Sequence, residues 1–313
     1  NTLTLGLVLC AGMLATAAEK TPAPAGKIIP PTAAWKAKIK QLAPAQPRVQ
    51  PKAPRKVLMC SLATGYCHDV IPHVKVVVNT LAATGAFEVV HSNDVDLFDA
   101  ASLKQFDAII LNNTCSKNPA RNLFIDALAE RADLTKKQQL ARAQELEKSL
   151  LEFVAKGKGL MAVHGAVVFL NKSDDFSNLL GASFVKHPPK QWMTLNLVEP
   201  NHPLVAAFKG EPFIHFDEPY YFNNAYEHKN FRPLLEMDIS SLNAKTQKVM
   251  QGDRRYVSWI KKHGKGRVFY VSPSHQPESY ESSRMLQYYL DGIQYVLGDL
   301  TCDDSVRKYT KRD

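Results

Sequence analysis

His164 directly follows an apolar run, residues 159–163, and is itself followed by Gly165. This pattern predicts a buried strand that ends in a sharp turn, and ligands of open α/β sheets bind beyond the carboxyl ends of such strands. Hydrolases of this build carry a nucleophile on the turn, whereas this turn carries an imidazole. Imidazole can act as a base, an acid or a metal ligand near neutral pH. We therefore expect the architecture of a nucleophile elbow without its nucleophile.

Other ionisable side chains occupy comparable positions. His68 follows the first predicted strand, His275 follows the last one, and Glu218 follows an apolar segment. Because parallel strands bring their carboxyl ends to one edge of a sheet, we expect His68 and His275 to converge with His164, and Glu218 to join them from the strand-rich second half. His187, which precedes two prolines, is expected on a loop that folds over the same edge.

Each position also has a purely structural interpretation. His164 could bond a backbone carbonyl, His68 could cap a helix, and Glu218 could simply form a turn. The tyrosines beside Glu218 favour a functional interpretation, because sugars stack on aromatic rings and hydrogen-bond to carboxylates. The resulting assignment is catalytic for His68, His164, Glu218 and His275, and substrate-binding for His187, Tyr220 and Tyr221.

These residue types are compatible with metal-assisted and with metal-free chemistry. Imidazole and carboxylate suit Zn²⁺, Mn²⁺ or a similar divalent cation, and they equally suit acid–base catalysis on a sugar. No short ligand signature such as H-E-x-x-H is present. A divalent metal therefore stays an open alternative, with candidate ligands His68, His164, His187, Glu218 and His275.

Alternating strands and helices must position these residues. In the first half, apolar runs typical of buried strands alternate with helical spacing, and Thr135 with Gln138 indicates a capping box. The second half is richer in strands and closes with a helix. The pattern predicts an α/β fold with a mostly parallel central sheet. The predicted strands are 56–61, 87–91, 107–112, 159–163, 192–198, 213–216, 256–260 and 267–272.

The ends of the chain differ in composition from its centre. The first residues are almost wholly apolar and finish in a small-x-small site, Ala15–Ala17, which predicts a signal peptide over 1–18 and a periplasmic or secreted protein. Residues 19–54, rich in Pro, Ala and Lys, are expected to form a disordered linker. One domain is expected over 55–298, followed by a basic tail over 299–313.

The formal net charge of +9 raises the question of nucleic-acid binding. Much of the excess lies in the terminal segments and no nucleic-acid motif is present, so we expect no such partner. No later apolar run is long enough to span a bilayer. The cysteines lack C-x-x-C spacing, which argues against structural zinc. Export permits disulfides, and a Cys67–Cys115 bridge is left open, as is the oligomeric state.

Seven phrases, taken in order, resemble the trehalose-utilisation (ThuA-like) family. The resemblance covers roughly residues 55–298 and implies a flavodoxin-like or class I glutamine amidotransferase-like α/β sandwich with a link to sugar metabolism. The family often has Ser-Ala after the elbow histidine, where this chain has Gly165 and Ala166, and Gly-His near the last strand, where this chain has Ser274 and His275. The phrases are 68–72, 157–164, 184–188, 201–204, 217–220, 264–270 and 274–275.

The resemblance implies a protein of carbohydrate metabolism that acts on a sugar or glycoside as a hydrolase, lyase or isomerase, and the predicted signal peptide makes it an exported one. One histidine would take a proton while Glu218 or a second histidine supplies one. The alternative is a non-catalytic sugar-binding module with the same pocket. Glutamine amidotransferase activity is rejected, because Cys60, Cys67 and Cys115 all lie outside the elbow.

Overall fold

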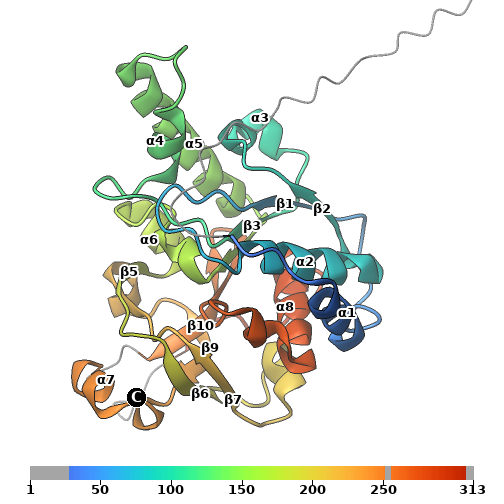
Figure 1. Ribbon diagram of the computed structural model, residues 1–313. Coiled ribbons are helices and arrows are strands. Elements are labelled where there is room, and N and C mark those ends of the chain that lie inside the picture. Colours follow the sequence, from blue (N-terminus) through green and yellow to red (C-terminus); the bar gives the residue numbers. More distant parts are fainter. Residues whose placement is uncertain (1–27, 251–254, 308–313) are drawn as a thin grey trace, which may run out of the picture.

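The computed structural model describes residues 28–250 and 255–307 (Figure 1). The predicted signal peptide over 1–18, the first part of the predicted linker and the end of the predicted tail lie outside these residues. Among the residues described, no helix combines the length and the apolar composition needed to cross a membrane.

The strands of the described chain form one nine-stranded and one two-stranded sheet. They are β1 (Lys56–Cys60), β2 (Glu88–His91), β3 (Ala108–Asn112), β4 (Gly159–Val163), β5 (Ser183–Lys186), β6 (Gln191–Leu197), β7 (Phe213–Asp217), β8 (Tyr221–Asn223), β9 (Arg232–Met237), β10 (Tyr256–His263) and β11 (Gly266–Val271). The large sheet has the order β2-β1-β3-β4-β11-β10-β9-β6-β7. It is parallel from β2 to β11 and antiparallel from β11 to β7. The predicted α/β class is confirmed, with an antiparallel half added to the parallel one.

Helices cover both faces of the parallel half (Figure 1). They are α1 (Ala33–Leu42), α2 (Ile71–Leu81), α3 (Ala100–Leu103), α4 (Leu123–Leu128), α5 (Lys136–Ala155), α6 (Asp174–Leu180), α7 (Ala244–Val249) and α8 (Ser283–Val296). Alternate residues of each strand point to opposite faces. Val57 and Met59 therefore join one core with α1, α2 and α8, while Leu58 and Cys60 join the other with α3 to α6. The predicted capping box of Thr135 and Gln138 opens α5.

The predicted disordered linker over 19–54 is wrong for its described part. Residues 33–42 form α1, and Ile39 on this helix is fully buried in the core. Further along, the Arg48 guanidinium lies 2.6 Å from the buried carboxylate of Asp291 on α8. The composition, rich in Pro, Ala and Lys, indicated disorder. The short helix was missed because it buries only one side chain completely and so shows no periodic apolar pattern.

The start of the predicted basic tail is also part of the fold. Asp299 is buried, and its carboxylate lies 2.5 Å from the Arg55 guanidinium. Leu300 is buried in the same core as α8. The fold therefore extends beyond both ends of the predicted domain. Ion pairs and single buried apolar side chains attach the flanking segments to it.

Candidate functional site

His164 lies at a sharp turn between β4 and the 3-10 helix η3 (His164–Val168). Its backbone φ is +48°, in the left-handed region that non-glycine residues rarely adopt. Backbone strain of this kind clusters at active sites and ligand clamps. The turn thus has the geometry of a nucleophile elbow, with a fully buried imidazole at the position of the nucleophile.

The hydrogen bonds of His164 fix its tautomer. Nδ1 lies 2.7 Å from the carbonyl oxygen of Ser272, and because a carbonyl only accepts, Nδ1 carries a proton. In the neutral form of the ring the lone pair is therefore on Nε2, which lies 2.8 Å from the hydroxyl of Tyr220. The purely structural role predicted for this histidine, a bond to a backbone carbonyl, is filled by Nδ1. Nε2 faces the other predicted site residues.

Three donor atoms form a compact triangle at this point. His164 Nε2 lies 3.2 Å from His275 Nδ1 and 3.4 Å from Glu218 Oε2. His275 Nδ1 lies 3.2 Å from the same carboxylate oxygen. His68 completes the group, since one donor atom from each of the four side chains lies within 4.8 Å of the others. We call His68, His164, Glu218 and His275 the histidine–glutamate cluster.

Gly165 makes room for the third imidazole. A Cβ at this position would lie 2.6 Å from His68 Cε1 and 2.6 Å from Cys115 Sγ, closer than any side chain tolerates. His68 packs edge-on against His164 and His275, with ring centroids 4.8 Å and 5.1 Å apart. The glycine that replaces the serine expected after the elbow histidine therefore lets His68 reach the cluster.

Glu218 reaches the cluster from the far edge of the sheet. It follows β7, which β10, β9 and β6 separate from β11 in the strand order. Asp217 anchors this return, because its Oδ2 accepts hydrogen bonds from the backbone N–H groups of Ser274 at 2.9 Å and His275 at 3.1 Å. One buried carboxylate thus ties the end of β7 to the segment that carries His275.

Burial and neighbouring charges set the protonation of the cluster. Burial raises the pKa of Glu218, but hydrogen bonds and charges from His164 and His275 outweigh it and hold the pKa well below its usual range. Burial, and after it the charges of the neighbouring imidazoles, lowers the pKa of His68 well below its usual value. At neutral pH, Glu218 is therefore an anion and His68 is neutral.

The three predicted substrate-binding residues occupy different places. Tyr220 touches the cluster through its hydroxyl. His187 is about a third exposed, stacks on Tyr220 with ring centroids 5.6 Å apart, and has Nδ1 3.6 Å from Glu218 Oε1. Tyr221 instead lies in the core on the α2 and α8 side, with the Lys186 ammonium 5.7 Å from its ring centroid. The cluster thus has Tyr220 against it and His187 at its rim, while Tyr221 packs elsewhere.

Residues that support the cluster escaped the sequence reasoning. Cys115 Sγ lies 3.8 Å from His68 Nδ1 and donates to the carbonyl of Gly165. Burial raises the pKa of Cys115 to about 12, so it remains a thiol, and all four described cysteines are free. Asp217 was detectable only as the neighbour of Glu218. Ser272 acts through its backbone carbonyl, which no side-chain pattern reveals.

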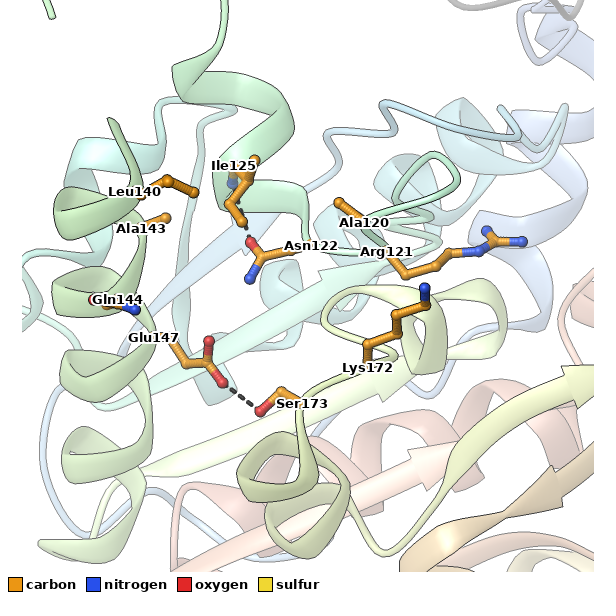
Figure 2. Close-up of a pocket in the computed structure, with 10 residues that line it drawn as sticks. All are labelled: Ala120, Arg121, Asn122, Ile125, Leu140, Ala143, Gln144, Glu147, Lys172 and Ser173. Carbon is orange, nitrogen blue, oxygen red and sulfur yellow. Dashed lines mark hydrogen bonds between the residues drawn. The ribbon is translucent and has the colours of Figure 1, made fainter. Parts of the chain in front are cut away.

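A separate cleft of about 310 Å³ lies beside α5 (Figure 2). Figure 2 shows Gln144 and Glu147 on this helix, with Glu147 accepting a hydrogen bond from Ser173 on the opposite side of the cleft. None of the residues that line this cleft belongs to the histidine–glutamate cluster. The cleft and the histidine–glutamate cluster are therefore two separate features.

The cluster offers two kinds of chemistry. Its imidazoles and carboxylate can exchange protons with a bound substrate. The same four side chains could instead hold a metal ion, since nitrogen and carboxylate oxygen donors converge on one point.

Comparisons with known proteins agree with this architecture. A family model named ThuA and described as trehalose utilisation matches residues 56–296. Among solved structures, the chain is similar to a ThuA-like protein from Bacteroides uniformis, with a TM-score of 0.57 at 16% identity over 78% of this chain and 92% of that one. A ThuA-like protein from Parabacteroides merdae gives 0.54 at 16% over 83% and 94%, and a cytoplasmic protein from Salmonella typhimurium gives 0.51 at 10% over 77% and 98%. At these identities the structural likeness concerns the fold alone, and no curated protein matches the sequence.

Proposed function

Because the chain belongs to the ThuA family, which is described by trehalose utilisation, we propose that it acts on a sugar or glycoside at the histidine–glutamate cluster. The observation that carries the proposal is the convergence of Glu218 with three imidazoles, drawn from four separate parts of the chain. Burying ionisable groups costs free energy unless they are paired, so core packing alone gives no reason for this arrangement. Groups with perturbed pKa values gather at functional sites.

The protonation states support acid–base chemistry. Neutral His68 has a lone pair with which to take a proton from a substrate hydroxyl. Glu218, held as an anion, would balance the charge of an imidazolium rather than donate a proton itself. The proton donor would then be one of the imidazoles beside it, His164 or His275. Hydrolysis, elimination and isomerisation of a sugar all need such a pair.

The rim of the cluster supports a sugar as the ligand. His187 stacks on the buried Tyr220, and the Nδ1 atom of the partly exposed His187 lies 3.6 Å from Oε1 of Glu218. Aromatic faces and a carboxylate together suit the apolar face and the hydroxyl groups of a sugar ring.

A covalent thiol mechanism has no support in this site. The thiol beside the cluster, Cys115, has its pKa raised to about 12 by burial, and a thiol is a poor nucleophile compared with a thiolate. Alkylating the thiols should therefore leave sugar turnover intact, and glutamine should not be hydrolysed. Ammonia release from glutamine that alkylation abolishes would overturn this part of the proposal.

The test is turnover of a sugar panel by the purified full chain. The panel contains trehalose, other disaccharides, simple glycosides and their oxidised forms, and products are detected by mass spectrometry. We expect at least one to be converted by the wild type and not by Glu218→Gln. No conversion of any sugar, or equal conversion by the variant, would contradict a catalytic role for the cluster.

A non-catalytic sugar-binding module is the alternative, and burial is the observation that favours it. The side chains of Glu218 and His164 are 9% and 0% exposed, so a ligand would meet the rim before it met the cluster. A sugar that raises the melting temperature without being converted would support this alternative.

Export stays a separate prediction, since the predicted signal peptide lies outside the described residues. We propose cleavage near Ala17, on the strength of the apolar run and the small-x-small site. N-terminal sequencing of protein from the native cell envelope checks it, and an uncleaved chain in the cytosolic fraction would refute it.

A further inference from the structure

We infer that the histidine–glutamate cluster binds one divalent first-row transition-metal ion, with Zn²⁺ as the best match to its geometry. As a cofactor for sugar chemistry this inference rests on the proposed function, but metal binding itself can be measured with no sugar present. The donors would be the four side chains His68, His164, Glu218 and His275.

The spacing of the donor atoms carries the inference. Ligand atoms at usual zinc distances around a tetrahedral ion are separated from one another by about 3.4 Å. The three edges of the triangle formed by His164 Nε2, His275 Nδ1 and Glu218 Oε2 measure 3.2, 3.2 and 3.4 Å. The donor atom of His68 lies within 4.8 Å of all three, which places it within reach of a fourth coordination position.

The hydrogen bonds behind the triangle match those of a metal-binding histidine. Such a histidine usually donates its second ring N–H to a carbonyl or carboxylate, which fixes the tautomer and orients the ring. His164 does this with the Ser272 carbonyl. On His68, Nδ1 faces the Cys115 thiol, which leaves Nε2 of that ring available.

Hydrogen bonding alone satisfies the cluster less well. His164 Nε2, His275 Nδ1 and Glu218 Oε2 lie within 3.4 Å of one another in a buried place, with the Tyr220 hydroxyl 2.8 Å from His164 Nε2. A hydrogen bond joins only one pair of these three atoms at a time. A divalent cation would attract all three atoms and the ring of His68 at once, and would offset the burial of the carboxylate.

The donor types select the class of metal. Imidazole suits zinc, copper, iron and nickel, and carboxylate suits manganese, whereas Mg²⁺ and Ca²⁺ prefer sites made wholly of oxygen. The nearby Cys115 thiol donates to the Gly165 carbonyl and is not one of the four converging donors, so the donor set consists of nitrogen and oxygen.

The test is metal analysis of the full chain, purified without a polyhistidine tag. We expect about one equivalent of a first-row divalent metal per chain by plasma mass spectrometry. After removal of the metal by a chelator, the melting temperature should fall, and ZnCl₂ or MnCl₂ alone should restore it. Metal-free wild type whose melting temperature responds to neither salt would overturn the inference.

Variants show where the metal binds. Glu218→Gln keeps the shape of the side chain and removes its charge, and it should weaken Zn²⁺ affinity more than about tenfold, as should His164→Ala. The matched control is His73→Ala, a buried histidine outside the cluster, which should retain the metal. Equal metal content in Glu218→Gln, His164→Ala and wild type would mean that the metal lies elsewhere. Sugar turnover by wild type after removal of the metal would refute a catalytic role for the metal and would leave the proposed function intact. A metal-bound protein that converts no sugar would count against the proposed function and would leave metal binding intact.

Discussion

The parallel and antiparallel halves of the sheet contribute to the cluster in different ways. The parallel half supplies His68, His164 and His275, each from the connection that follows the carboxyl end of a strand. The antiparallel half supplies Glu218, from the end of a strand at the far edge. The histidines are therefore placed by a rule common to parallel sheets, whereas the carboxylate depends on one specific return of the chain.

This difference shows where the chemistry of the site is decided. The three histidines offer only ring nitrogens, and it is Glu218 that introduces a carboxylate and its negative charge. Its place is held by Asp217, whose carboxylate bonds the backbone beside His275. Changes in the two halves should therefore have separable consequences, and the following predictions separate them.

The largest expected effect comes from removing the contribution of the antiparallel half. Glu218→Gln should lower sugar turnover by about 10²–10⁴-fold, because it removes the only carboxylate of the cluster. The melting temperature of the metal-free protein should change little, since the amide fills the same space. A variant that unfolds instead of losing turnover would indicate a structural role.

The next largest effect is expected on stability and not on turnover. It comes from Arg48, in the segment that packs against α8 on the parallel half. Arg48→Met leaves the fully buried Asp291 carboxylate without its charged partner and should destabilise the fold by about 3 kcal/mol. Denaturant unfolding at two pH values measures this loss. The exposed Lys36 gives the control, and Lys36→Met should be nearly neutral.

The loss caused by Arg48→Met should shrink in acid. Burial already raises the pKa of Asp291, and Arg48 opposes that rise, so the variant should have a still higher pKa. A carboxyl group whose folded pKa is raised loses its penalty as pH falls through that value, because it takes up a proton. An equal loss at pH 4 and pH 7 would contradict this account of the pair.

A smaller effect on turnover is expected from loosening the contact between the halves. Asp217→Asn removes the charge from two backbone hydrogen bonds and should lower turnover by about tenfold through misplacement of Glu218. The loss should appear with unchanged metal-free stability to within about 1 kcal/mol. Turnover equal to wild type would show that Glu218 is held by other contacts.

The smallest expected effect concerns Asp107, which directly precedes β3 at the end of the parallel strands away from the cluster. Although burial raises the pKa of Asp107, the ammonium of Lys158 and the backbone of Lys56 hold it below its usual value. The Asp107 carboxylate therefore stabilises the fold at any pH above its pKa in the unfolded chain. This stabilisation is lost as the pH falls through its lower pKa in the folded protein. Asp107→Asn should cost about 0.5 kcal/mol at pH 7 and almost nothing at pH 2.

The sequence predicted the parallel half better than its surroundings. Strand ends can be recognised from short apolar runs, so His164 and His275 could be assigned to one edge before any coordinates. Glu218 was expected at the same place, but its route from the far edge of the sheet could not be derived, because the course of an antiparallel sheet depends on packing between residues far apart in the chain. Tyr221 illustrates the same limit, since adjacent residues of an extended segment point to opposite sides and only Tyr220 faces the cluster.

The segments before and after the predicted domain were hidden for a different reason. Helix α1 buries one apolar side chain completely, Ile39, and the rest of the attachment consists of ion pairs such as Arg55 with Asp299. Neither feature produces a periodic pattern. Composition alone therefore predicted disorder where single contacts impose order.

A double-mutant cycle on sugar turnover tests most directly whether the two halves form one catalytic centre. His164→Ala removes a donor from the parallel half and Glu218→Gln removes one from the antiparallel half. If the side chains act as a unit, the double variant should be no slower than the slower single variant, since each change alone already disables the centre. Losses that multiply in the double variant would contradict a shared centre and would mean that the two residues act independently.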